Sequence, residues 1–190
     1  MSNNYVKKYD VGNLYLDLPY ANCIYELPLL TFGDMRNTVN LSLIFNHKLK
    51  EDGDNSFNMT AGYKLNLQKR IFLNNENTAY YQEANGKIEQ LFSDTNSNGI
   101  CTFDDDSQRI IFSQSSGEYL LEYPDFSKEK YDSSGRITET IDKYGDRLLT
   151  YVYTGNLLTS IVFRPDSAGT EHKTVTLGYN SSSRDRKSVV

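Results

Sequence analysis

The sequence predicts an all-β fold, arranged as an antiparallel curved sheet of consecutive hairpins. Three observations support this prediction: apolar and polar residues alternate in several segments, turn-forming clusters separate those segments, and no segment has a helical pattern. Strict alternation places the apolar side chains on one face of a half-buried strand. No window of about 12 residues carries the i, i+3, i+4, i+7 apolar spacing of an amphipathic helix. Strands at short spacing with turns between them are typical of all-β proteins.

Six segments carry the alternation, and each is expected to form a strand with its apolar residues facing inward. In chain order they comprise residues 13–20, 39–46, 61–68, 119–123, 157–163 and 175–179. In the second segment the apolar, inward set is Val39, Leu41, Leu43 and Phe45, and residues 40, 42, 44 and 46 are expected on the opposite face.

Clusters rich in Gly, Asn, Asp and Ser lie between these segments and are expected to form the connecting turns. Glycine adopts positive φ without steric cost, and Asn and Asp side chains hydrogen-bond to the turn backbone. The clusters comprise residues 51–55, 74–77, 83–86, 94–99, 115–117, 132–135 and 143–146.

The composition is that of one aromatic-rich domain without features for membranes or nucleic acid. The chain has 190 residues, 15 tyrosines and a formal net charge of −5 at pH 7. An acidic chain without a basic cluster is poorly suited to binding nucleic acid or anionic membranes. No apolar run approaches the ~20 residues of a membrane-spanning helix, and residues 1–10 lack the apolar stretch of a secretory signal. Cys23 and Cys101 lie far apart, which argues against a disulfide framework or a zinc site.

One segment has the spacing of an EF-hand calcium loop. Oxygen-bearing side chains stand at positions 1, 3, 5 and 12 of this loop, with glycine at position 6; they are Asp94, Asn96, Asn98 and Asp105. Two of these groups are neutral amides, and position 12 is Asp where Glu normally binds through both oxygens. Because the flanking residues have strand spacing, we expect a turn between strands and no bound metal or cofactor.

No catalytic constellation is evident, so the chain is expected not to be an enzyme in itself. The carboxylates of Asp104, Asp105 and Asp106 would point to alternate faces of a strand and cannot form the pair that glycoside hydrolysis needs. His47 and His172 are the only histidines, and neither has metal-site spacing. A Ser or Cys nucleophile with a partnering base stays open, although nothing points to one.

The second half of the chain contains a repeat whose unit runs tyrosine, polar turn, glycine, polar residue, aliphatic residue. One copy starts at Tyr131 and reaches its aliphatic residue at Ile137, and the next runs from Tyr153 to Leu157. Tyr179 follows 26 residues after Tyr153, and the first two tyrosines are 22 residues apart. Such spacings are typical of repeat architectures. Each unit is expected to be a hairpin whose tyrosine packs over the turn; a generic meander with frequent tyrosines is the alternative.

Residues 131–138, 141–146 and 150–153 resemble the YD repeat of the Rhs (rearrangement hot spot) proteins. That family's pattern runs Tyr-Asp-x-x-Gly-Arg-Leu, then Asp-x-x-Gly-Asn, then Tyr-x-Tyr. This chain departs from it at Ile137, Asp146 and Thr154. Upstream, residues 39–46 and 61–66 are similar to the lead-in strands of these proteins. The resemblance assigns structural repeat positions to Tyr131, Asp132, Gly135, Arg136, Ile137, Ile141, Gly145, Tyr151, Tyr153, Gly155 and Tyr179.

The resemblance implies a structural role. Family members fold YD repeats into a sheet that spirals into a hollow shell, which in bacterial members encloses a C-terminal toxin and in animal relatives forms part of adhesion receptors. Residues 1–75 would then be a β lead-in and 76–183 a hairpin array. The implied partners are the rest of a longer chain and cell-surface or secretion-system proteins. The full-length protein would be secreted or carried to the cell surface, and the alternative is a cytoplasmic location before export. The alternative is an adhesin or glycan-binding module with exposed tyrosine rows.

The last residues differ from the rest in period and composition. Residues 185–190 have the sequence that a common sequencing adapter encodes, so we expect 184–190 to be a non-native tail on a fragment of a longer protein. A genuine short basic tail is the alternative. A fragment of a shell would present an unpaired strand at its C-terminal edge.

Overall fold

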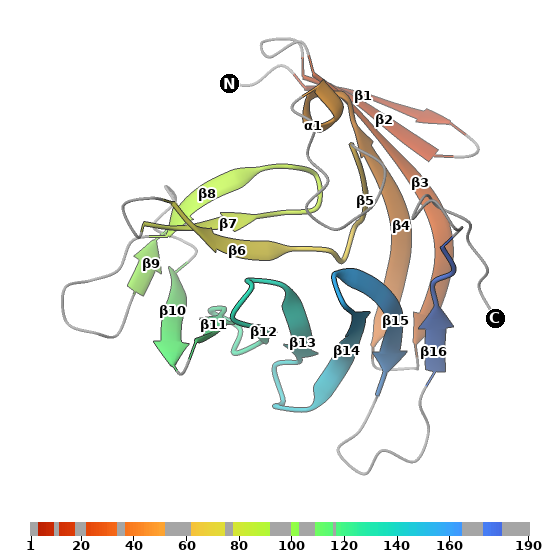
Figure 1. The fold of residues 1–190 in the computed structure, drawn as a ribbon. Coiled ribbons are helices and arrows are strands. Elements are labelled where there is room, and N and C mark those ends of the chain that lie inside the picture. Colours follow the sequence, from red (N-terminus) through yellow and green to blue (C-terminus); the bar gives the residue numbers. More distant parts are fainter. Residues whose placement is uncertain are drawn as a thin grey trace.

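The structure, a computed structural model, describes residues 4–9, 12–17, 22–33, 37–51, 62–74, 78–91, 100–102, 109–115, 117–164 and 173–179. Within these ranges the chain forms sixteen strands and one short helix. Every strand pair is antiparallel, so the prediction of an all-β antiparallel fold is confirmed. The strands form three sheets in which hydrogen-bonded neighbours follow one another along the chain (Figure 1).

The N-terminal sheet consists of β1 (Asn4–Tyr9), β2 (Gly12–Asp17), β3 (Asn22–Gly33), β4 (Thr38–Asn46) and β5 (Tyr63–Leu65), and α1 (His47–Glu51) follows β4. The middle sheet consists of β6 (Arg70–Leu73), β7 (Ala79–Gln82) and β8 (Ile88–Leu91). The expected boundary between residues 75 and 76 falls between β6 and β7, which pair with each other. The described part of the chain contains no helix long and apolar enough to cross a membrane.

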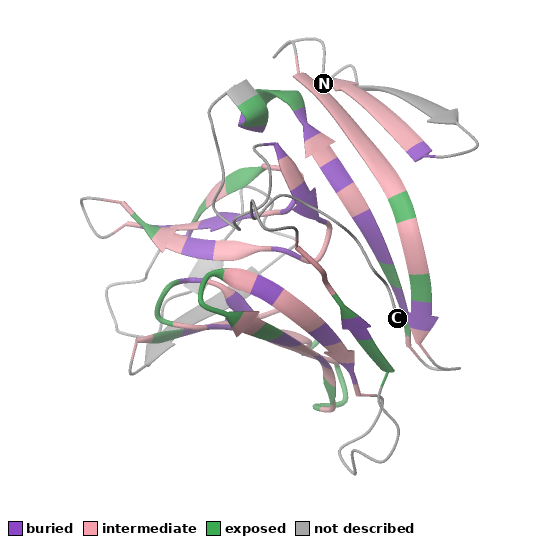
Figure 2. Cartoon of the chain, turned by 45° about the vertical axis from the view of Figure 1, so that its right-hand side comes forward, coloured by how far each residue is buried: buried purple, intermediate pink, exposed green. Residues whose placement is uncertain are grey.

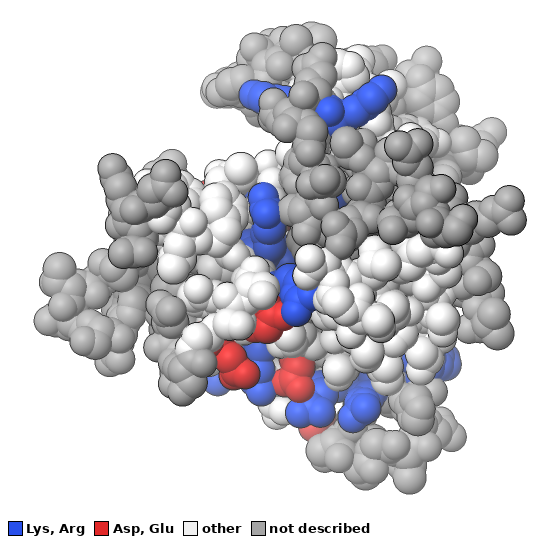
Figure 3. Space-filling model, viewed as in Figure 1, with Lys and Arg blue, Asp and Glu red and all other residues white. Residues whose placement is uncertain are grey.

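The C-terminal sheet consists of β9 (Ile100–Thr102), β10 (Arg109–Ser115), β11 (Glu118–Glu122), β12 (Lys128–Tyr131), β13 (Ile137–Ile141), β14 (Arg147–Thr154), β15 (Leu157–Phe163) and β16 (Lys173–Thr176). It is an uninterrupted meander with β9 and β16 at its edges. Cross-strand ion pairs stabilise neighbouring strands on a solvated face. Lys128 pairs with Glu122, and Glu139 pairs with both Lys130 and Arg147. Figure 3 shows acidic side chains interleaved with basic ones over the lower half of one face.

The three sheets enclose one hydrophobic core, to which strands of every sheet contribute. Buried residues recur along these strands (Figure 2), and Leu121, Leu158 and Ile161 are fully shielded from solvent. The N-terminal and C-terminal sheets meet where the rings of Phe32 and Phe163 pack edge-to-face, with their centroids 6.0 Å apart. Burial of this aromatic and aliphatic surface is the main force that holds the sheets together.

The alternation predicted for β4 is correct in its first half and wrong in its second. Val39 and Leu41 are buried as expected, but Ser42, Ile44 and Asn46 are also buried, whereas Leu43 and Phe45 are half-buried. Contacts on the second face account for this difference. The Asn46 side chain accepts a hydrogen bond from the Leu49 amide of α1 (3.2 Å) and donates one to the carbonyl of Asn85 in the β7–β8 turn (2.5 Å). This part of β4 is therefore covered on both faces.

Strand β5 is shorter than the predicted segment 61–68, because a turn follows Leu65. Lys64, expected on the polar face, is 2% exposed. It pairs with Ile44 of β4, which is buried as well.

Four five-residue turns in the middle and C-terminal sheets have the same backbone geometry. In each, the amide of the first residue donates to the carbonyl of the fifth, and the amide of the fourth residue donates to the carbonyl of the first. The turns comprise residues 83–87, 123–127, 132–136 and 142–146. The fourth residue adopts positive φ, and it is Gly86, Gly135 or Gly145 in three turns. In the turn 123–127 it is Phe126, with φ 69°. Glycine adopts positive φ without steric cost, which is the role that the sequence predicted for the glycines of these turns.

Candidate functional site

The repeat positions of the sequence form a recurring hairpin unit in the C-terminal sheet. Tyr131 pairs with Ile137 across one hairpin, and Tyr153 pairs with Leu158 across another. In both, the register shifts immediately before the tyrosine, so that one threonine of the returning strand, Thr138 or Thr159, has no directly paired residue. The unit that was expected to end at Leu157 therefore ends at Leu158.

The two bulged threonines make the same contact. Thr138 donates through its hydroxyl to the carbonyl of Lys130 (3.1 Å), and Thr159 donates to the carbonyl of Val152 (3.1 Å). The acceptor in each case is the residue that precedes the repeat tyrosine. Each bulge thus satisfies a backbone carbonyl that the shifted ladder would otherwise leave to solvent.

The tyrosine hydroxyls link each unit to the preceding one. Tyr153 donates to the carbonyl of Ile137 at 3.0 Å, and Tyr179 donates to the carbonyl of Leu158 at 2.6 Å. Ile137 and Leu158 occupy equivalent positions, being the buried residues opposite Tyr131 and Tyr153. The spacing that the sequence reveals between the three tyrosines therefore corresponds to a repeated contact between neighbouring units.

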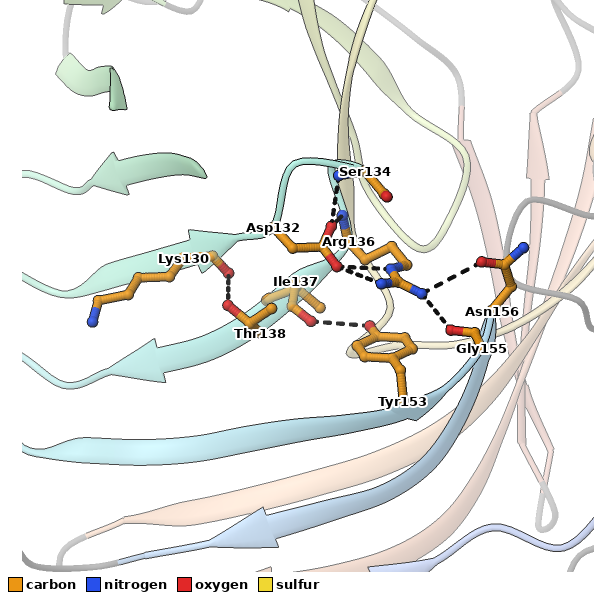
Figure 4. Close-up of polar contacts among 9 residues, drawn as sticks. All are labelled: Lys130, Asp132, Ser134, Arg136, Ile137, Thr138, Tyr153, Gly155 and Asn156. Atoms are coloured by element: carbon orange, nitrogen blue, oxygen red, sulfur yellow. Dashed lines mark hydrogen bonds and ion pairs between the residues drawn. The ribbon is translucent and has the colours of Figure 1, made fainter. Parts of the chain in front are cut away.

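An ion pair connects two turns at the same end of the meander (Figure 4). The Asp132 carboxylate accepts hydrogen bonds from the backbone amides of Ser134 and Arg136, and its second oxygen pairs with the Arg136 guanidinium at 2.7 Å. The guanidinium also donates to the carbonyl of Gly155 (2.6 Å) and lies 4.7 Å above the ring centre of Tyr153. Asp132 and Arg136 thus stabilise their own turn and hold the next one.

The Gly135 turn packs directly on the middle sheet. Its carbonyl accepts a hydrogen bond from the Ile71 amide (2.9 Å), and Arg70 and Arg136 form an isolated antiparallel bridge. A Cβ atom on Gly135 would lie 1.7 Å from the Ile71 carbonyl oxygen, and φ at this glycine is +76°. Both the close approach and the conformation require glycine here.

A buried ionic cluster lies next to this contact and was not predicted from the sequence. Glu129 of β12 is 5% exposed; its carboxylate pairs with Lys69 and accepts hydrogen bonds from the hydroxyls of Tyr123 (2.7 Å) and Tyr131 (2.6 Å). Alternation provides a signal for it, because Glu129 lies two residues before the buried Tyr131 and so faces the same way. The surrounding lysines at 128 and 130 make the segment resemble a solvated strand instead.

Burial and charge act together on the pKa values in this cluster. Burial, followed by the Glu129 charge, raises the pKa of Tyr123 and of Tyr131 well above the ordinary value. Burial by itself would lower the pKa of Lys69, but Glu129 and Tyr81 together more than offset it, and the pKa is raised. The cluster therefore keeps its lysine charged and its tyrosines neutral at neutral pH, and the lysine is paired with Glu129.

The other predicted positions lie in the same sheet. Tyr151 is buried, with its hydroxyl 3.3 Å from that of Thr140, Ile141 is half-buried at the end of β13, and Gly145 and Gly155 stand in turns with positive φ. Asp94, Asn96, Asn98 and Asp105 of the calcium-loop candidate lie outside the described residues, as do the 104–106 carboxylates. Among the described residues, no group of His, Cys, Asp and Glu side chains is placed to hold a metal ion.

Comparisons with known proteins do not assign a role to this chain, so a role must be inferred from the fold and its contacts. The chain matches no protein-family model, and no curated protein matches it significantly.

Proposed function

We propose that this chain is a structural segment of a YD-repeat β-shell of the Rhs type, with no catalytic role of its own. The observation that carries the proposal is the recurring contact between units, in which Tyr153 and Tyr179 each donate to a carbonyl of the preceding hairpin. The Asp132–Arg136 pair adds a second connection, from one turn to the next. Contacts that join each hairpin to its neighbour suit a wall that grows by adding strands at one edge.

On this proposal the mechanism is enclosure. β16 is the edge strand on the C-terminal side of the meander, and further units of the longer protein would pair with it. The enclosed cargo would be a C-terminal toxin or effector domain, and the full-length protein would be secreted or carried to the cell surface.

The burial of the repeat tyrosines favours the shell over a glycan-binding module. Tyr131 and Tyr151 are each less than 10% exposed, Tyr179 is half-buried, and Tyr153 is half-buried beneath Arg136. A row of rings that stacks on sugars must present its faces to solvent. On the described strands these rings pack inside the protein instead.

The decisive test begins with the coding sequence downstream of residue 183. Continued Tyr-Asp-x-x-Gly units followed by a variable C-terminal domain are expected. The full-length protein is then treated with protease, and the C-terminal domain should be protected. Arg136→Ala and Tyr153→Phe in the full chain should increase its cleavage, whereas the exposed-site control Val152→Ala should not. Downstream sequence without such units, or equal cleavage with and without the repeat contacts, would refute the proposal.

A further inference from the structure

The turn 123–127 exposes an aromatic side chain at a position where the chain otherwise uses glycine. Phe126 has φ 69°, a conformation unfavourable for any residue with a Cβ atom. The three turns of identical geometry have Gly86, Gly135 and Gly145 at this position. The Phe126 side chain is 69% exposed, so packing within the chain does not compensate for the strain. Strained residues without a structural reason are characteristic of binding sites.

A second exposed aromatic residue lies on the neighbouring turn at the same end of the sheet. Tyr144 belongs to the β13–β14 turn and is 75% exposed, the highest value among the large apolar residues that the structure describes. Alternate connections of a meander lie at the same end, which brings the turns 123–127 and 142–146 together. Asp125 of the first turn and Tyr144 of the second line the same cleft.

This cleft has a volume of about 930 Å³, and its lining contains both acidic and apolar residues. Ile141 and Leu148 contribute its apolar part. Its charged lining residues are the three acids Asp125, Asp142 and Asp146 and one base, Lys143. Hydrogen bonds from Ser127 and the charge of Lys143 lower the pKa of Asp125, so its carboxylate is ionised at neutral pH. The chain's own cation, Lys143, already lies 5.1 Å above the Tyr144 ring.

We propose that Phe126, Tyr144 and the cleft that Tyr144 lines form a docking surface for a partner protein whose contact surface is basic and presents an apolar side chain. Phe126 stands between Asp125 and Ser127, which both line the cleft. Aromatic residues are enriched at protein interfaces, and the apolar part of the cleft lining offers contacts to an apolar side chain of the partner. The carboxylates of the lining select a basic partner by charge complementarity and accelerate its association. This surface is separate from the contacts between repeat units, which lie at the opposite turns and within the sheet.

The test uses the full chain labelled with nitrogen-15 and follows amide chemical shifts on addition of defined probes. The probes are a glycine-spaced peptide of arginine and leucine, its counterpart with glutamate in place of arginine, and the neutral saccharide maltohexaose. The arginine peptide is expected to shift the amides of residues 123–127 and 140–148 and to bind more weakly as salt is added. Stronger binding of the glutamate peptide or the saccharide, shifts elsewhere, or no shift would overturn the proposal.

The variants separate binding from folding. Phe126→Gly relieves the strained conformation, so it should raise the unfolding midpoint while weakening peptide binding by at least about tenfold. Tyr144→Ala should weaken binding to a similar extent with an unchanged midpoint. Val152→Ala, which alters an apolar residue 41% exposed on β14 away from the cleft, is the matched control and should leave binding intact. Undiminished binding by Phe126→Gly or Tyr144→Ala would refute the role of these rings.

Discussion

Replacing Gly135 with alanine tests how the C-terminal sheet is held against the middle sheet. An alanine Cβ would lie 1.7 Å from the Ile71 carbonyl oxygen and 2.8 Å from its carbonyl carbon. Both are backbone atoms of β6, so no side-chain rotation relieves the overlap and the turn must move away. Gly145 provides the control, because it has the same turn geometry and φ +89°, but a Cβ there would meet nothing within 4 Å.

The contacts give the size of the expected effect. Positive φ in a residue with a Cβ costs about 1 kcal/mol, and this applies to both variants. At Gly135 the displaced turn also loses the hydrogen bond from the Ile71 amide, about 1 kcal/mol. Partial exposure of the Ile71 side chain, now 1% exposed, adds about 1–2 kcal/mol. We expect Gly135→Ala to lower the free energy of unfolding by about 3–4 kcal/mol and Gly145→Ala by about 1 kcal/mol.

Urea denaturation followed by circular dichroism and tyrosine fluorescence measures this difference, since the chain has 15 tyrosines and no tryptophan. Hydrogen exchange at the Ile71 amide locates the change, and protection there should fall in Gly135→Ala alone. If the two alanine variants lose the same stability to within about 0.5 kcal/mol, the close contact with β6 does not hold the sheets together.

Four further outcomes follow from the described contacts. Glu129→Gln should lower the free energy of unfolding by about 3 kcal/mol, because it leaves the half-buried Lys69 ammonium without its counter-charge. Adding Lys69→Met should recover part of the loss, and a single variant as stable as the double would contradict this. Tyr153→Phe should cost about 1 kcal/mol through the lost hydroxyl contact, measured by urea titration. Phe126→Gly should stabilise by about 1 kcal/mol, visible as a higher thermal midpoint, and a lower midpoint would contradict the strain. Because burial and the neighbouring carboxylate raise the pKa of Tyr131 above 10.0, the contribution of Tyr131 to stability should be constant below that pH. Above it, stability should fall as the unfolded state ionises, with a shallower slope in Tyr131→Phe.

The repeat shows which parts of the structure can be predicted from the sequence. Tyrosine spacing and Asp-x-x-Gly turns are local patterns, and they correctly indicated the hairpins that begin at Tyr131 and Tyr153. The equivalence of Ile137 with Leu158, rather than Leu157, could not be predicted. It depends on a bulge, in which one threonine is unpaired, and nothing in the local sequence specifies that register.

The inter-sheet contacts were harder to predict, because they join residues distant in sequence. Glu129 binds Lys69 from 60 positions away, and its neighbours are charged residues that favour a solvated strand. The turn 123–127 was missed for a different reason. Its diagnostic fourth position holds Phe126, so the glycine signal that marked the other three turns is missing.

The direction of the tyrosine contacts has a consequence for the order in which the meander forms. Each donor, Tyr153 or Tyr179, lies later in the chain than the carbonyl it binds. During synthesis a hairpin therefore emerges before the hydroxyl that secures it, and each newly made strand completes the unit that precedes it. Because an isolated hairpin is only marginally stable in water, the meander should consolidate progressively from its N-terminal side. Limited proteolysis of ribosome-bound nascent chains of increasing length would detect this as protection of the Tyr131 hairpin before the Tyr153 hairpin.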